Sequence, residues 1–314
     1  MKIQTFVLAA CAVLATSPLQ ANDSIDYHPQ TEVKQYNGYQ LVWHDEFDRD
    51  GKPSDDWSFE QGFVRNNELQ WYQEDNATVK DGLLVIEGRK ETVANPHYRE
   101  GDCHWTRSRR EAHYTSSSLT TRKSHVFRYG RFEVRAKIPT ASGSWPAIWL
   151  LGNQWSWPEN GEIDMMEYYI KDGRPSILSN TCWGSNRAFT PVWNSVVTPF
   201  EHFTHRDAQW TEKFHVWRMD WDEQFIRLYL DDELLNVTDL SKTRNGGVDG
   251  NHENPFSNNI EAFSSISRLS LIAATFFIDL ALALLAVPVC ALRLAFFNAL
   301  RLAANALPDN FLDL

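Results

Sequence analysis

Residues 131–138 alternate between charged and apolar side chains without a break. A period of two places the apolar side chains on one face of a β-strand and the charged ones on the other. Residues 214–221 and 226–230 repeat the pattern, and Asp231-Asp232 then turns the chain into residues 234–237 as a hairpin. Half-buried strands of this kind are typical of antiparallel sheets. The chain is therefore expected to build antiparallel β-sheet.

A second stretch, residues 161–168, sets three carboxylates within six residues. On an ideal strand, Glu162 and Asp164 share one face and Glu167 points the opposite way. One extra residue in the strand, a β-bulge at Met165-Met166, brings Glu167 back to their face. We therefore expect three acids in a line along one face of a strand.

Such a line is electrostatically costly, because neighbouring like charges raise one another's pKa values. Retaining glycosidases use it: one carboxylate attacks the sugar carbon, and a second, kept protonated, gives its proton to the leaving oxygen. The two carboxyl groups lie about 5–5.5 Å apart in these enzymes. Glu162 is then the nucleophile and Glu167 the acid/base. Asp164 is expected to hydrogen-bond one of these two glutamates and so fix its position and its charge. A solvated acidic strand edge and a calcium site are alternatives, since both also gather carboxylate oxygens.

The order Glu162-Ile163-Asp164-Met165-Met166-Glu167 resembles the active-site strand of glycoside hydrolase family 16. Two residues, Met165 and Met166, separate Asp164 from Glu167, and this spacing resembles that of the family's bulged branch. That branch includes laminarinases, agarases and carrageenases. Further matches follow in the family's order at residues 43–48, 67–70, 129–137 and 145–152. The resemblance implies an antiparallel β-jelly-roll sandwich with a substrate groove, hydrolysis with retention and no required cofactor. It favours an endo-β-glucanase acting on 1,3- or mixed 1,3-1,4-β-glucan.

By the same resemblance, Trp145 and Trp149 form the groove floor, where an indole stacks on a sugar at small entropic cost. A core position is the alternative, above all for Trp149. Trp183 is expected to stack a sugar beyond the cleavage point. Laminarinases commonly carry a His in a Leu-His-Gly context near this strand end, and this chain has Cys182-Trp183-Gly184. The difference leaves mixed-linkage glucan open beside 1,3-glucan.

The same resemblance implies that Asn67 borders the sugar subsites before the cleavage point. It also implies that His215 lies near the groove. A structural role is the alternative for both. A structural calcium site through the Asp45-Glu46 region is left open, and no cluster of His and Cys predicts another metal. Cys103 and Cys182 could pair in an oxidising compartment, but their spacing does not decide it.

The net charge of −11 argues against a nucleic-acid partner, because acidic side chains outnumber the basic ones that would neutralise phosphates. It also makes sulfated polysaccharides less favoured than neutral glucans. A polysaccharide is the expected partner, and we expect a monomer. Two alternatives remain: a hydrolase of another polysaccharide such as agar or carrageenan, and a catalytically impaired carbohydrate-binding sandwich.

Residues 1–21 are typical of a secretory signal, with Lys2, an apolar run and small residues near Ala21. They predict a secreted, periplasmic or cell-surface protein of a bacterium; lipidation at Cys11 is the alternative. A buried strand is disfavoured there because nothing alternates. Residues 22–38 are expected to form a polar, flexible lead-in. Residues 39–47 are expected to form the first strand of a family-like domain that runs over residues 39–260.

Residues 261–314 depart from the family, whose last strands are missing, and this is expected to leave strand edges unpaired. Residues 269–292 are almost wholly apolar and predict a helix. Three interpretations of this tail are open: a membrane contact, a helix packed against the open sheet, and the product of a shifted reading frame. Asp279 would cost about 2.5–3.5 kcal/mol within a membrane. The abrupt change of composition favours the third interpretation.

Overall fold

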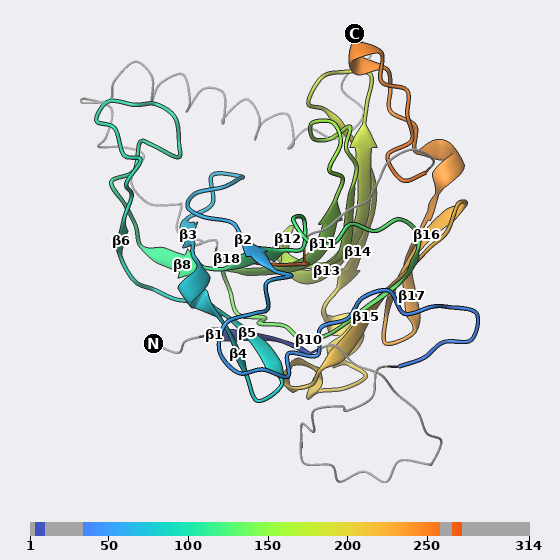
Figure 1. Cartoon of the computed structure of the whole chain (residues 1–314), viewed down its shortest axis with the longest axis horizontal. Helices are drawn as coiled ribbons and strands as arrows, with labels where there is room; N and C mark the ends of the chain where they lie inside the picture. The colour runs from blue at the N-terminus through green and yellow to red at the C-terminus, as the bar shows by residue number, and fades with distance from the viewer. Residues whose placement is uncertain (1–3, 10–33, 258–265, 272–314) are drawn as a thin grey trace. The chain divides into compact units, whose positions relative to one another are not determined.

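The computed structural model describes residues 4–9, 34–257 and 266–271. Its strands form two seven-stranded antiparallel sheets (Figure 1). Sheet A has the order β17 (Glu233–Asp239), β16 (Phe225–Leu230), β15 (His215–Trp221), β10 (Gly130–Lys137), β1 (Gln4–Ala9), β5 (Leu83–Gly88), β4 (Ala77–Lys80). Sheet B has the order β14 (Pro191–Pro199), β13 (Arg174–Gly184), β12 (Glu162–Lys171), β11 (Ser144–Leu151), β18 (Ile266–Leu271), β9 (Ser118–Thr120), β2 (Ser58–Phe59).

The other described elements are short. A parallel pair joins β3 (Gln70–Tyr72) to β8 (Tyr114–Ser116), and a further pair joins β6 (Val93–Ala94) to β7 (Glu111–Ala112). One α-helix, α1 (Glu201–Thr204), is found in the described part of the chain, together with 3-10 turns at Glu74–Asn76, Trp210–Glu212, Leu240–Lys242 and Val248–Gly250. The described fold is thus nearly all-β.

Apolar side chains from both large sheets form one core. Trp217 of sheet A and Ile148 and Ile163 of sheet B are fully buried in it. The hydroxyls of Thr181 on β13 and Thr238 on β17 lie 2.8 Å apart in a hydrogen bond, which joins the two sheets directly. An antiparallel sandwich of two sheets on a shared core confirms the predicted all-β jelly-roll class.

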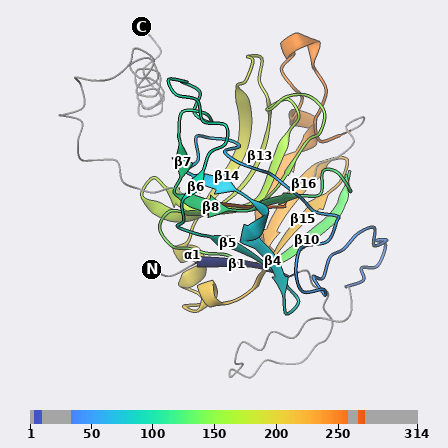
Figure 2. The same ribbon diagram turned by 60° about the vertical axis from the view of Figure 1, so that its left-hand side comes forward.

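The three alternating stretches become neighbouring strands of sheet A, as Figure 2 shows for β10, β15 and β16. On β10 the apolar residues Val134 and Ala136 are buried. Arg131 points the other way and donates two hydrogen bonds, of 2.6 and 2.9 Å, to the carboxylate of Asp220 on β15. The period of two therefore predicted both the strands and their buried faces.

The predicted strand over residues 39–47 is wrong, because the structure forms none there. Asp45 accepts a hydrogen bond from the main-chain N–H of Phe47 at 2.9 Å, and Phe47 adopts a left-handed φ of 55°. A side chain that bonds its own backbone offers the chain an alternative to a strand ladder. Apolar composition alone did not reveal this turn.

Strand β1 pairs with β10 on one side and with β5 on the other. The sequence disfavours a strand here because its residues do not alternate. Pairing on both edges satisfies the main-chain hydrogen-bonding groups of this strand, and such pairing does not depend on alternating side chains. Residues 10–33, which hold the remainder of the predicted signal and most of the lead-in, lie outside the described residues.

Strand β18 pairs with β11 and with β9 in sheet B. The expected helical tail is therefore wrong for Ile266–Leu271, because pairing satisfies backbone groups that β11 and β9 would otherwise leave open. Residues 272–314, which hold the remainder of the predicted membrane-contact segment 269–292 and the rest of the tail, lie outside the described residues. Within the described residues, no helix has the length and apolar character needed to cross a membrane.

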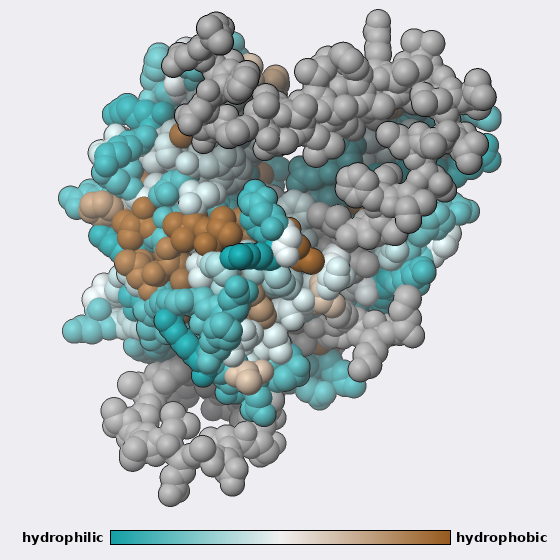
Figure 3. Space-filling model, turned by 180° about the vertical axis from the view of Figure 1, so that it is seen from behind, coloured by the Kyte–Doolittle hydropathy of each residue, from teal (hydrophilic) through white to brown (hydrophobic). Residues whose placement is uncertain are grey.

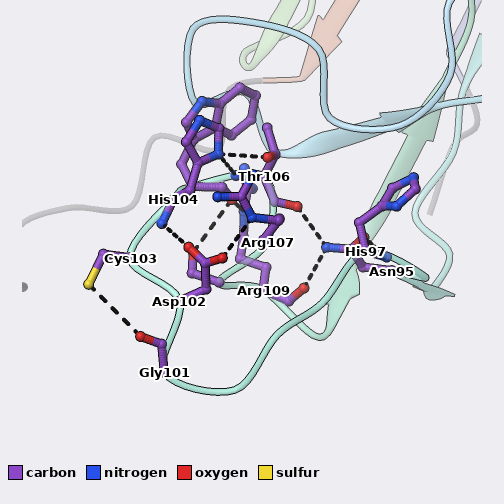
Figure 4. A network of polar contacts seen from close by, with 11 residues as sticks. Asn95, His97, Gly101, Asp102, Cys103, His104, Thr106, Arg107 and Arg109 are labelled. Carbon is purple, nitrogen blue, oxygen red and sulfur yellow. Dashed lines mark hydrogen bonds and ion pairs between the residues drawn. The ribbon is translucent and has the colours of Figure 1, made fainter.

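The segment Ala94–Arg110 belongs to a second compact unit. Figure 4 shows the polar contacts that hold it without regular structure. Asn95 donates a hydrogen bond of 2.9 Å to the main-chain oxygen of Thr106 across the loop. Asp102 accepts one of 2.7 Å from Nε of Arg107. Side-chain bonds of this kind give an irregular loop a defined course.

The edge strands of the two large sheets, β14 and β17, are linked by a hydrogen bond of 3.0 Å from Asn194 to the main-chain oxygen of Val237. Val192, Val197 and Leu234 on these strands are exposed, as is Val237 itself. Figure 3 shows apolar side chains gathered in one patch on the face turned away from the viewer in Figure 1. The two edges therefore meet and still leave apolar side chains at the surface.

Candidate active site

Strand β12 carries a β-bulge at Met165. Consecutive residues of β11 pair with Met166 and Asp164, so Met165 has no residue opposite. The pairing with β13 shifts by one residue between Asp164 and Glu167. Met165 and Met166 are both buried in the core, which consecutive strand residues achieve only where the alternation breaks. The bulge that the spacing of the acids predicts is confirmed.

The bulge places Glu167 on the face that carries Glu162 and Asp164. Asn180 lies directly across from Asp164 on β13. Its Nδ2 donates one hydrogen bond to Oδ2 of Asp164 and a second to Oε2 of Glu167, each 3.1 Å long. Asp164 also hydrogen-bonds Glu162. One amide reaches both acids only from the same side of the sheet, so the three carboxylates form a single cluster.

Each glutamate of the cluster also accepts a hydrogen bond from an indole. Nε1 of Trp157, in the loop before β12, donates to Oε2 of Glu162 at 2.6 Å. Nε1 of Trp145, on β11, donates to Oε1 of Glu167 at 2.8 Å. Hydrogen bonds to an ionised oxygen are stronger than those between neutral groups. The two indoles therefore hold both carboxylates in one orientation.

Burial and mutual repulsion set the protonation of the cluster. Burial raises the pKa of Glu162, but the Trp157 N–H, Asp164 and the charge of Arg65 act against this rise. Burial and the charge of Glu162 raise the pKa of Glu167 to about 7. Burial and both glutamates raise the pKa of Asp164 well above its usual value. The surroundings therefore support ionised Glu162 more than the ionised form of the other two acids.

Trp149 stands opposite Asp164 on the neighbouring strand β11. The guanidinium of Arg65 lies over its ring, 5.2 Å from the centroid, and is itself ion-paired with Glu60. Cation–π contact holds the arginine on the ring. With 5% of its surface exposed, Trp149 is too buried to stack on a sugar. Trp149 is therefore buried beneath Arg65 on the face of the sheet that carries the acid cluster, and it is not exposed as a groove floor.

Trp183 is not brought to the acid cluster. Cys182 pairs with Glu162 and so shares its face, which leaves the next residue, Trp183, on the opposite face. There the ring packs against the core. This placement corrects the expectation that Trp183 stacks a sugar beside the carboxylates. Trp145, by contrast, reaches Glu167 directly and is only partly buried.

His215 lies on sheet A and its ring is fully engaged. Nδ1 bonds the carboxylate of Asp231 and Nε2 lies 2.9 Å from the main-chain oxygen of Trp210. The ring stacks on the Trp210 indole with 3.8 Å between centroids. His215 is therefore structural, which corrects the predicted groove position. Asn67 is exposed in a left-handed turn with a φ of 53°, and no contact brings it to the carboxylates.

Two residues of the site were missed from the sequence, Asn180 and Trp157. Asn180 sits at an inward position of a strand that follows the acidic strand through a short turn. The pairing register of this hairpin places Asn180 opposite Asp164, so a register assigned from the sequence would have indicated Asn180. Trp157 lies in an irregular loop, where no periodic pattern indicates which way an indole points. Its role becomes visible only from the hydrogen bond to Glu162.

No group of three or more His, Cys, Asp or Glu side chains suited to a metal ion occurs among the residues that the structure describes. In the predicted calcium region, the Asp45 carboxylate already accepts bonds from Ser54, Trp57 and the Phe47 N–H. Cys103 is exposed and Cys182 is buried, and no disulfide joins the two.

An antiparallel sandwich with three clustered carboxylates on one strand face defines a class, the β-sandwich glycosidases. Comparison with known proteins identifies the family: residues 65–261 match the sequence model described as glycosyl hydrolases family 16. The chain therefore belongs to glycosyl hydrolases family 16.

Individual relatives fit this assignment. A β-glucanase of Rhodothermus marinus is 36% identical over 207 residues, which cover 62% of this chain and 64% of that protein. The laminarinase catalytic domain of Thermotoga maritima is 29% identical with a TM-score of 0.58, covering 74% of this chain and 87% of that one. A structure from work on endo-acting O-glycanases of human gut bacteria is 34% identical with a TM-score of 0.64, covering 75% and 81%.

Proposed function

We propose that this protein is a retaining endo-β-glucanase that hydrolyses 1,3- or mixed 1,3-1,4-β-glucan. The observation that supports it most is the cluster of Glu162, Asp164 and Glu167 on one face of the bulged strand β12. The names of the relatives add to it, since one is a β-glucanase and another a laminarinase.

In the proposed first step, the carboxylate of Glu162 attacks the anomeric carbon and forms a glycosyl ester. The glycosidic C–O bond breaks as Glu167 gives its proton to the departing oxygen. In the second step, ionised Glu167 takes a proton from water, and the hydroxide oxygen displaces Glu162 from the anomeric carbon. Two displacements on the same carbon return the original configuration.

Electrostatics favour this division of roles over the reverse. Glu167, with a pKa of about 7, retains a proton to donate in neutral solution. Glu162 receives support for its ionised form from the Trp157 N–H, from Asp164 and from the charge of Arg65. Asp164, whose pKa is raised well above its usual value, is the proton-bearing partner in its bond to Glu162. A nucleophile has to be ionised and an acid protonated, so Glu162 and Glu167 fit those roles.

A second substrate class has support of its own. The O-glycanase structure has a higher TM-score with this chain than the laminarinase, 0.64 against 0.58. This chain also has Trp183, within Cys182-Trp183-Gly184, where laminarinases commonly carry a His in a Leu-His-Gly context. A mucin-type O-glycan is therefore the alternative substrate, cleaved by the same carboxylates.

The proposal is tested by incubating the purified protein with laminarin, lichenan, agarose and mucin side by side. Released reducing ends and the masses of the products are measured, with Glu162→Ala as the control for contaminating activity. We expect short oligosaccharides from laminarin or lichenan. Cleavage of mucin alone would replace glucan by the O-glycan alternative, and glucan binding without any product would indicate a catalytically impaired carbohydrate-binding protein.

We also propose that the chain is exported and that residues 1–21 are removed, with lipidation at Cys11 as the alternative. The apolar run after Lys2 and the small residues near Ala21 support it. Strand β1 falls within this leader, so its removal would vacate the position between β5 and β10. The intact mass of the exported protein decides: we expect residues 1–21 to be missing, and a protein that still begins at Met1 would contradict export by this signal.

A further inference from the structure

Three side chains on three neighbouring strands form a chain of hydrogen bonds that ends at the acid cluster. Ser195 on the edge strand β14 pairs with Asn180 on β13, which in turn pairs with Asp164 on β12. Directly opposed residues share a face, so all three point to the side of the carboxylates. Oγ of Ser195 donates to Oδ1 of Asn180 at 2.6 Å. Asn180 then donates from Nδ2 to Asp164 and to Glu167, at 3.1 Å each.

The donors and acceptors allow this network in one orientation of the amide. The amide has a carbonyl oxygen that accepts and an NH₂ group that donates. Turned round, the amide of Asn180 would aim its oxygen at Glu167, and lone pairs would face lone pairs whenever Glu167 is ionised. The Ser195 hydroxyl adds a donor on the other side, where only an oxygen can accept it. Ser195 therefore favours the orientation in which the NH₂ group reaches both acids.

We propose that Ser195 is a positioning residue for the hydrolysis, which acts through Asn180 to fix the acid/base Glu167 and its neighbour Asp164. This inference rests on the proposed function, and it assigns to an exposed serine of an edge strand a role in the chemistry two strands away. Ser195 itself contacts neither carboxylate. Its effect is on the direction in which the amide points.

The network has a predictable effect on titration. The hydrogen bond from Asn180 lowers the pKa of Glu167, against the larger opposing effects of burial and of the charge of Glu162. Losing the bond removes support for the ionised form, so the pKa of Glu167 rises further above about 7. Glu167 has to be protonated for the first step, so activity falls as pH rises through this pKa. The alkaline limb of the kcat/KM profile is therefore expected to move to higher pH.

The other titratable and charged side chains described around Glu167 are Glu162, Asp164 and Tyr169 on its own strand, Cys182 on β13, and Arg65, which acts on Glu162. Burial, Glu162 and Asp164 raise the pKa of the Cys182 thiol, and burial and nearby carboxylates raise that of Tyr169, so both stay neutral. None of these side chains bonds Ser195. Replacing Ser195 therefore leaves them in place.

The test compares Ser195→Ala, which removes the hydroxyl, with Ser195→Thr, which keeps it. Thr198→Ala is the matched control, since it removes a hydroxyl from the same strand on the opposite face. We expect Ser195→Ala to lower kcat by roughly tenfold, the equivalent of one hydrogen bond of ordinary net strength. Its alkaline limb should move to higher pH, whereas Ser195→Thr and Thr198→Ala should keep the original profile.

A double-mutant cycle separates the effect that Ser195 has through Asn180, here called the relay, from a general loss of structure. If Ser195 acts through Asn180, then Ser195→Ala should have no further effect in an Asn180→Ala background. Additive effects of the two substitutions would overturn the proposal. A rise in KM with an unchanged kcat and alkaline limb would also overturn it, because Ser195 would then be binding the sugar directly.

A readout without substrate keeps this test apart from that of the proposed function. The carboxyl carbons of ¹³C-labelled glutamate are followed by NMR as the resting protein is titrated. The signal of Glu167, assigned by its loss in Glu167→Gln, should titrate at higher pH in Ser195→Ala than in the unsubstituted protein. An unchanged titration would refute the relay even in an active enzyme. A shifted titration in a protein that cleaves no glycan would support the relay and count against the proposed function.

Discussion

Replacing Glu162 with alanine is expected to lower kcat/KM on glucan by roughly 10⁴- to 10⁶-fold, the range seen when an essential catalytic group is removed. The alanine has no oxygen with which to attack the anomeric carbon, and no other carboxylate faces the sugar from that position. The measurement is the initial rate of release of reducing ends. Asp172→Asn is the matched control, because Asp172 is an exposed carboxylate in the turn that follows the same strand.

A small anion should restore part of the lost activity. With a β-glycosyl fluoride as substrate, azide can enter the space left by the Glu162 side chain and attack from the same side. The C–F bond breaks, a C–N bond forms, and the product is an α-glycosyl azide. Full turnover of Glu162→Ala without azide would show that Glu162 is not the nucleophile.

Replacing Glu167 with alanine is expected to lower kcat/KM on glucan by roughly 10²- to 10⁴-fold, the contribution typical of general acid–base catalysis. The sugar oxygen would then have to leave without a proton. A glycosyl fluoride needs no such proton, so its first step should be nearly unaffected.

The pH profile gives a separate test of Glu167. Burial and the charge of Glu162 raise its pKa to about 7, so the protonated form that the first step needs is lost as pH rises through that value. The unsubstituted protein should therefore lose activity above about pH 7, and Glu167→Ala should lack this alkaline limb. If the limb is unchanged in Glu167→Ala, another group supplies the proton. Azide should yield a β-glycosyl azide with this variant, because it replaces water in the second step.

The acid cluster could be predicted from the sequence because it depends on residues that are close together in the chain. The spacing of Glu162, Asp164 and Glu167 requires one extra strand residue, and the two methionines between them supply apolar side chains that both enter the core. Strict alternation likewise indicated β10, β15 and β16 with their buried faces. In each case, the pattern and the pleat of a strand were enough.

Features that depend on pairing with distant strands could not be predicted in this way. The face on which Trp183 lies depends on the pairing of β13 with β12, which sets Cys182 opposite Glu162. His215 looked like a groove residue until its partners, Asp231 and the Trp210 carbonyl, were known. Arg65, whose guanidinium lies over the Trp149 ring, belongs to a loop more than eighty residues earlier in the sequence. Sequence patterns do not record contacts of this range.

The central claim is that the bulge at Met165 sets Glu162 and Glu167 on one face of strand β12, where they can flank the scissile bond and cleave it by two displacements. The most direct test is the configuration of the first product, followed by ¹H NMR of the anomeric proton before mutarotation. We predict that the newly formed reducing end appears first as the β-anomer. An α-anomer as the first product would mean a single displacement by water, and it would contradict the roles assigned to both glutamates.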